Sequence, residues 1–224
     1  MTARIRWGAI LWASSIQFFI AQVIVAIGWT TSYSLATRYI SDLGNTACAP
    51  YPAGSFTYVC SPWHVGMNAS FALLGVTMCA GAVLIAETFR AGVLRATGLG
   101  LIAVAGIGVF LVGLFPENEN IAAHTLGAGL NFVCGNLGMV VLGVAGVEPR
   151  VRRGFDLLTA SLGLSGLLGT WLFVSGLFLG IGQGGMERVA AYPLTVWLIL
   201  AGGRAIGSAA MDGGQHRAGL SHHS

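Results

Sequence analysis

The sequence predicts an all-α, polytopic membrane protein: a bundle of six transmembrane helices with both termini in the cytoplasm. Composition is the first observation behind this prediction, because 55% of the 224 residues are hydrophobic and only 8% are charged. A soluble domain with this composition and a mean hydropathy of +0.77 would expose large apolar patches. The second observation is a series of long apolar stretches, and the third is the placement of arginine, which indicates the orientation.

Six apolar stretches are each close to the roughly 20 residues that a helix needs to cross a bilayer. The predicted spans cover residues 7–29, 64–86, 96–115, 124–147, 157–181 and 189–209. Glycine is abundant, at 34 residues, and its recurrence in the third and fifth spans indicates close helix packing. We expect one transmembrane domain over 1–210, followed by a polar, disordered cytoplasmic tail over 211–224.

Arginine indicates the orientation of the spans, because the sequence contains no lysine. Nine of the 11 arginines fall at one set of span ends, whereas Arg38 and Arg188 fall at the other set. The positive-inside rule then places both termini in the cytoplasm and the long first connector, 30–63, outside. Most other connectors are short, so spans that are adjacent in sequence are expected to be antiparallel neighbours in space.

The cysteines agree with this orientation. Cys48 and Cys60 both lie in the connector that is expected outside, where an oxidising compartment allows disulfides to persist. A bond between them would close a loop of about a dozen residues and stabilise the fold by roughly 3 kcal/mol on the chain-entropy model. We therefore expect a Cys48–Cys60 disulfide, and we interpret Cys79 and Cys134, which lie in mid-span, as packing residues.

Polar and ionisable side chains gather at the span ends on the same side as the first connector. Such groups are costly near lipid and are functional candidates by default. The catalytic candidates are Asp42, His64, Glu117 and His124, and the ligand-binding candidates are Asn68, Asn118, Asn120, Asn131, Glu187 and Arg188. We expect the four catalytic candidates to converge in one outward-facing pocket under the disulfide loop, with Asn68 and Asn131 below them.

Two chemistries suit the catalytic candidates. His64, His124 and Asp42 can bind zinc and leave one position open for water, which makes zinc the one cofactor to consider. Without a metal, the same side chains can form a His–Asp acid–base pair. Helical spacing supports a shared site, because His64 and Asn68 are four residues apart and lie on one face of the second span.

A purely structural role is the alternative for the same polar groups. Asp42 can cap a short turn, and Glu117 can favour the start of the fourth span through the helix dipole. Glu187 and Arg188 can form an ion pair at the membrane interface. In this alternative the polar groups join the connectors to the helix ends and carry no chemistry.

Three sequence segments resemble a known family. They are Arg38-Tyr39-Ile40-Ser41-Asp42-Leu43-Gly44-Asn45, then Cys60 to Asn68 with the sequence CSPWHVGMN, and Phe115-Pro116-Glu117-Asn118 followed by His124. In these segments the chain resembles the bacterial membrane family catalogued as domain of unknown function 998. The resemblance implies a six-helix integral protein of the bacterial plasma membrane whose activity is unassigned.

The sequence narrows the function to a few classes. The middles of the spans lack Asp, Glu, His, Arg and Lys, which argues against a proton-coupled pump with a charged relay through the membrane. We expect an outward-facing polar pocket that binds or hydrolyses a lipid or lipid-linked substrate. The alternatives are a transporter or binding protein for small solutes or lipids, and a structural membrane protein. Membrane lipids are the expected partners, with no nucleic acid, and the oligomeric state stays open.

Overall fold

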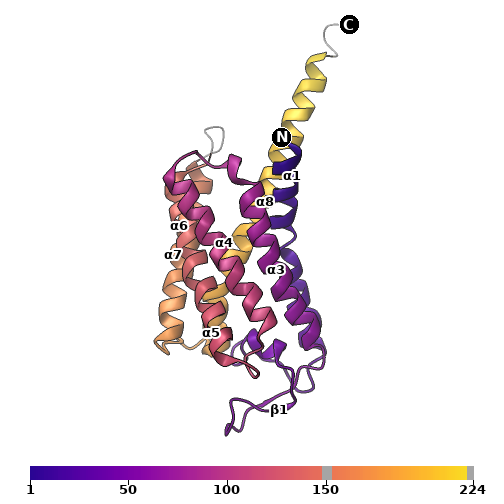
Figure 1. The fold of residues 1–224 in the computed structure, drawn as a ribbon, viewed down its shortest axis with the longest axis vertical. Coiled ribbons are helices and arrows are strands. Elements are labelled where there is room, and N and C mark those ends of the chain that lie inside the picture. Colours follow the sequence, from indigo (N-terminus) through magenta and orange to yellow (C-terminus); the bar gives the residue numbers. More distant parts are fainter. Residues whose placement is uncertain (148–152, 221–224) are drawn as a thin grey trace.

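A computed structural model describes residues 1–147 and 153–220 of the chain, which form a bundle of long helices (Figure 1). Six helical segments of this part are long and apolar enough to cross a membrane: Ala3–Ile27, His64–Leu84, Val93–Leu114, Ile121–Ala145, Gly154–Val174 and Gly182–Ser208. The six-helix membrane fold and the multi-pass character predicted from the sequence are thereby confirmed.

The elements follow one another in a simple order. They are α1 (Ala3–Ala13), α2 (Ile16–Ile27), the 3₁₀ helix η1 (Ser41–Gly44), β1 (Ala49–Pro50), β2 (Tyr58–Val59), α3 (His64–Leu84), the 3₁₀ helix η2 (Ala86–Thr88), α4 (Val93–Leu114), α5 (Ile121–Leu130), the π-helix η3 (Asn131–Gly135), α6 (Asn136–Ala145), α7 (Arg153–Val174) and α8 (Gly182–Leu220). The first span is therefore two helices, and the fourth is a helix with one π turn in its middle.

The bundle has two distinct ends (Figure 1). The N-terminus and the last turns of α8 lie at one end, which we call the terminal end. The first connector lies at the opposite end, together with the turns over 115–120 and 175–181, and we call this the connector end. Helix α3 packs on α4 so closely that a Cβ on Gly75 would clash with the Gly106 carbonyl oxygen, as expected for glycine seams.

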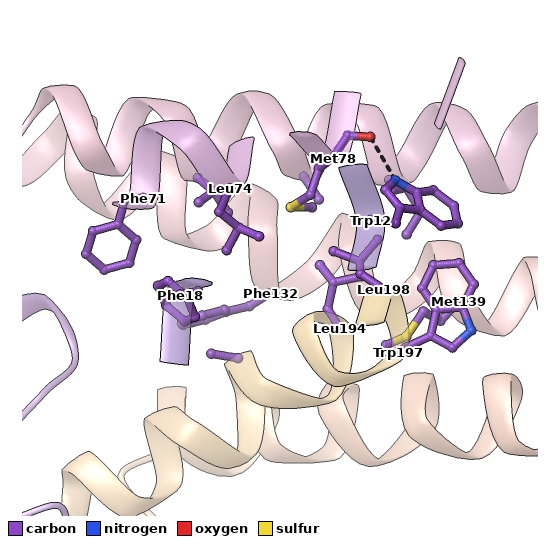
Figure 2. Packing of buried hydrophobic residues seen from close by; sticks show 14 of the residues in the cluster. Trp12, Phe18, Phe71, Leu74, Met78, Phe132, Met139, Leu194, Trp197 and Leu198 are labelled. Carbon is purple, nitrogen blue, oxygen red and sulfur yellow. Dashed lines mark hydrogen bonds between the residues drawn. The ribbon is translucent and has the colours of Figure 1, made fainter. Parts of the chain in front are cut away.

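Aromatic and aliphatic side chains fill the centre of the bundle (Figure 2). Trp12 of α1 is fully buried, and its ring centroid lies 5.1 Å from that of Trp197 of α8. The Trp12 indole Nε1 donates to the Met78 carbonyl of α3 at 3.3 Å, and the Trp197 indole donates to the Thr159 hydroxyl at 2.9 Å. Both indole N–H groups are therefore satisfied, and the two rings tie α1, α3, α7 and α8 together.

Two helix boundaries differ from the predicted spans. Helix α7 ends at Val174 rather than near 181, because the following segment contains glycines with positive φ, among them Gly176 and Gly180. Helix α8 begins at Gly182, seven residues before the predicted span, so Glu187 and Arg188 lie within this helix and not in a connector.

The C-terminal tail also differs from the prediction. The sequence predicts disorder from residue 211, but helix α8 continues to Leu220, and 221–224 lie outside the described residues. The physical reason is that extending an existing helix needs no new nucleus, and this stretch contains no proline that would end it.

The first connector folds against the connector end of the bundle. Its short strands β1 and β2 pair antiparallel, with Ala49 opposite Val59. The Cys48–Cys60 disulfide joins the two sides of this hairpin, as predicted from the cysteine positions. The connector thus carries two constraints of its own before it contacts any helix.

Candidate functional site

The 3₁₀ helix η1 is the part of the first connector that enters the bundle. All residues from Ser41 to Asn45 are buried, and the Leu43 side chain is completely inaccessible. Burying a connector requires partners for its backbone and side-chain polar groups. The helices supply these partners from the same polar residues that the sequence suggests as site candidates.

Asp42 and Glu117 form the centre of this contact. Glu117 accepts hydrogen bonds from the Ser41 hydroxyl at 2.7 Å and from the Asn45 amide at 3.1 Å. Asp42 accepts one from the Tyr39 backbone N–H at 2.9 Å, and the carboxyl groups of Asp42 and Glu117 are hydrogen-bonded to each other. Asp42 thus bonds to the backbone just before its own turn, and it also bonds to Glu117.

Burial, together with the negative charge of Asp42, raises the pKa of Glu117 to about 8, although the hydrogen bond from the Ser41 hydroxyl opposes this shift. Burial also raises the pKa of Asp42, although its hydrogen bonds from Glu117 and Tyr39 oppose this effect. Glu117 is therefore mainly a neutral carboxylic acid at pH 7, and its O–H group donates a hydrogen bond to the Asp42 carboxylate. The two buried carboxyl groups share one proton, so two negative charges are not placed side by side out of water.

Glu187 and Arg188 bind the connector separately. A Glu187 carboxylate oxygen accepts the backbone N–H of Ile40. Arg188 donates from Nη1 to the carbonyl groups of Leu35 and Arg38, at 3.0 and 2.9 Å. The predicted Glu187–Arg188 ion pair is wrong: within the described residues, the ion pair at 4.0 Å or less is that of Arg4 with Glu87. The reason is helical geometry, since consecutive side chains do not face each other.

The turn between α4 and α5 contacts the connector as well. The Asn118 side chain accepts the Thr46 backbone N–H at 3.2 Å, and the Tyr51 hydroxyl donates to the Glu117 carbonyl at 3.0 Å. Asn120 is the N-cap of α5, accepting the Ala123 backbone N–H at 3.1 Å. The predicted helix-dipole role of Glu117 is therefore taken by this cap, and Glu117 faces the connector instead.

His64 and Asn68 of α3 also face the connector. The Nδ1 atom of His64 lies 2.9 Å from the Ser61 carbonyl, and the Asn68 amide donates to the Gly44 carbonyl at 2.9 Å. Neither residue lines the cavity described next. The structure thus brings Asp42 and Glu117 into contact with each other, whereas it gives His64 and Asn68 separate backbone partners.

A cavity of about 40 Å³ lies where η1 meets the helices. Its walls are mostly apolar, and its polar lining residues are Ser41, His124, Asn131, Glu187 and Thr195. His124 is 7% exposed, and its Nδ1 lies 2.9 Å from the Phe115 carbonyl, which can only accept a hydrogen. Nδ1 therefore carries the hydrogen, and Nε2 remains an acceptor in the neutral ring. The Asn131 Oδ1 atom is buried without a hydrogen-bond partner.

The geometry of the described residues does not support the predicted zinc site. Within the residues that the structure describes, no three or more His, Cys, Asp or Glu side chains are placed to hold a metal ion. Two of the predicted zinc ligands have other partners: Asp42 bonds to Tyr39 and Glu117, and His64 contacts Ser61. The predicted ligand trio of His64, His124 and Asp42 therefore gains no support from the geometry.

A second hollow lies on the side of the bundle between α2 and α8. This groove has a volume of about 430 Å³ and is lined by Phe19, Gln22, Val23, Ala26, Ile27, Tyr33, Leu35 and Tyr192. Two polar pairs border it: the Tyr192 hydroxyl donates to Gln22 Oε1 at 2.8 Å, and Arg188 Nη2 donates to the Tyr33 hydroxyl at 2.6 Å. The lateral groove, as we call it, opens on the face that the lipid would cover.

Sequence reasoning missed several residues of these two hollows. Gln22 and Tyr192 escaped attention, although a glutamine within an apolar span is itself a signal of a buried polar contact. Ser41 and Thr195 carried no such signal, because hydroxyl side chains are common in membrane helices and their ends. Only the packing of η1 onto the bundle identifies them.

A comparison with known protein families gives one match. A family model described as "Protein of unknown function (DUF998)" matches residues 13–204, which is most of the chain and includes all three resembling segments. No curated protein and no solved structure matches the chain.

Proposed function

The chain belongs to the DUF998 family, whose function is unknown, and we propose from its own geometry that it binds a membrane lipid in the lateral groove. The observation that carries this proposal is a groove of about 430 Å³ that combines an apolar wall with two hydrogen-bonded polar pairs. Ligand sites commonly have this size and this mixture, with a few polar groups that orient the ligand.

The apolar wall suits an acyl chain. Val23 and Ile27 of α2 are 61% and 75% exposed, and they lie four residues apart on the same helix face. Phe19 and Ala26 extend this surface along the helix. A lipid chain lying along α2 would cover it, and van der Waals contact of this kind drives association within a bilayer.

The polar border suits a lipid group that donates hydrogen bonds. The Tyr192 hydroxyl donates a hydrogen bond to Gln22, so the lone pairs of its oxygen can accept hydrogen bonds from a ligand. The Tyr33 hydroxyl donates to the Tyr39 carbonyl at 2.7 Å and accepts from Arg188, which holds it in place. Hydroxyl or amide N–H groups near the glycerol or amide region of a lipid are the matching donors.

The arginine distribution supports a location for the groove. We infer that the protein lies in the bacterial plasma membrane with its connector end outside, because most arginines fall at the other span ends. The groove then opens to the outer leaflet, close to the head groups.

Hydrolysis of the bound lipid receives less support than binding. Glu117, Glu187 and Asp42 accept hydrogen bonds from the connector, and each bond is part of how η1 is held. These contacts favour an anchoring role for the carboxyl groups, in line with the structural alternative. Binding therefore accounts for the groove, and anchoring accounts for the acidic residues.

Lipid analysis of the purified protein tests the proposal. The full chain is extracted in a mild detergent, and bound lipids are identified by native mass spectrometry. Val23→Trp fills the groove and should reduce the bound lipid strongly. Leu168→Trp, at a residue of α7 that is 56% exposed and does not line the groove, is the matched control and should retain it. Equal lipid content in both variants would show that the groove is not the site.

A further inference from the structure

Several hydrogen-bond acceptors line the cavity beneath η1. His124 offers Nε2, because its Nδ1 hydrogen is directed to the Phe115 carbonyl. Asn131 offers Oδ1, which has no partner, and Glu187 offers a carboxylate that also accepts the backbone N–H groups of Ile40 and Ser41. All three side chains line the cavity, and no lysine or arginine does. The unpartnered Asn131 oxygen and the Glu187 carboxylate favour a ligand that brings its own hydrogen-bond donors.

Aromatic rings form much of the remaining wall. Phe18, Phe71 and Phe132 line the cavity, and the ring centroids of Phe18 and Phe71 lie 5.3 Å apart. The faces of aromatic rings attract cations, and the attraction is stronger where water is excluded. A carboxylate, unpaired acceptors and aromatic rings around one space together favour a donor-rich cation over a neutral or anionic ligand.

The helix segment that carries Asn131 on the cavity wall is a π turn. Asn131 opens the π-helix η3, and π turns of this kind occur frequently at functional sites. The Asn136 side chain donates to the carbonyl groups of Phe132 at 2.7 Å and Ala190 at 3.0 Å. These bonds fasten the π turn to α8, so the positions of the Asn131 amide and the Phe132 ring are set before a ligand arrives.

The volume limits the size of the ligand. A space of about 40 Å³ has room for a few water molecules, since each needs about 10–15 Å³ on this measure. An ammonium or methylammonium ion is of matching size, whereas a quaternary ammonium group is too large. We propose that this cavity is a binding site for a small ammonium cation, held by Glu187, Asn131 and His124 against the phenylalanine rings. This inference uses a different site from the lateral groove and does not rest on lipid binding.

Thermal unfolding of the full chain in detergent, with added salts at equal ionic strength, tests this inference. Ammonium and methylammonium chloride should raise the unfolding temperature, because a ligand that binds only the folded state stabilises it. Sodium, potassium and tetramethylammonium chloride should have no comparable effect. Equal shifts with all these salts would overturn the proposal and leave the cavity as a water-filled space.

Two variants locate the effect in the cavity. Asn131→Leu removes the unpaired acceptor, and Glu187→Gln removes the charge while an amide oxygen can still accept the Ile40 N–H. Each variant should bind methylammonium more weakly and so raise the half-saturating concentration by about tenfold or more. Asn118→Leu, which loses a connector contact outside the cavity, is the matched control and should respond like the parent chain. An unchanged response in both cavity variants contradicts the assignment.

A lipid head group can also supply a primary ammonium. The same unfolding measurement in nanodiscs with phosphatidylethanolamine, compared with phosphatidylcholine, distinguishes this source. Protection by phosphatidylethanolamine without any effect of methylammonium would overturn a site for a small free cation. Protection by methylammonium in both nanodiscs supports it, and the parent chain alone provides this result if the variants do not fold.

Discussion

The burial of Glu117 predicts how the stability of the folded protein depends on pH. Its neighbours are the Ser41 hydroxyl, the Asn45 amide and the Asp42 carboxylate, and its side chain is 7% exposed. Replacing it with glutamine keeps a neutral group of similar shape, whose amide can donate to Asp42 and whose single oxygen can accept from Ser41 or Asn45. Replacing it with alanine instead leaves all three neighbours buried without their partner.

The magnitudes separate these two variants. A pKa of about 8 in place of the usual 4.5 means that ionising Glu117 costs the folded state on the order of 5 kcal/mol more than ionising it in water. The contribution to stability is complete below pH 4.5 and is lost progressively as the pH rises from there to 8. In Glu117→Gln the part of the pH dependence that comes from Glu117 should disappear. In Glu117→Ala, two or three unpartnered polar groups at about 1–3 kcal/mol each should cost about 2–9 kcal/mol relative to the parent chain at low pH, where Glu117 is protonated.

Unfolding of the detergent-solubilised chain between pH 5 and 9 measures these effects. The parent chain should lose stability with rising pH, and the Glu117→Gln curve should fall clearly less steeply over the same range. The matched control is Glu119→Gln, because Glu119 is an exposed carboxylate in the same turn. A parent curve and a Glu117→Gln curve with the same slope would refute the protonated Glu117–Asp42 pair.

Two further predictions concern the connector and the orientation. Cys48→Ser should lower the free energy of unfolding by roughly 3 kcal/mol, the value for a loop of about a dozen residues, and reducing agent should do the same to the parent chain but not to the variant. Recovery of Cys48 and Cys60 as free thiols from unreduced protein would contradict the bond. A reporter active only outside the cytoplasm, fused after Ser224, should give no signal, because arginine places the terminal end inside. A strong signal there would reverse the orientation and move both hollows to the cytoplasmic side.

The polar residues show how far sequence reasoning reaches toward a site. Asp42, Glu117 and Glu187 could be chosen from the sequence because acids near lipid are rare and need a reason to be there. Their partners could not, since Glu117 bonds to Ser41 and Asn45 more than 70 residues away. His64 and His124 have equal standing in the sequence, yet only His124 lines the cavity.

The sequence by itself determined the spans and the disulfide. Crossing a bilayer requires a local property, an apolar stretch of about 20 residues, and two cysteines in one short connector have few other partners. The break at Ser14 and Ser15, the π turn at Asn131 and the start of α8 at Gly182 were decided by the tertiary structure, because these features depend on what each helix packs against. The rotation of each helix about its own axis was also decided by the tertiary structure. Periodicity assigns residues to a helix face, but only packing turns that face toward a neighbouring helix. For that reason Gln22 meets Tyr192, and Asn131 faces the cavity, only in the folded bundle.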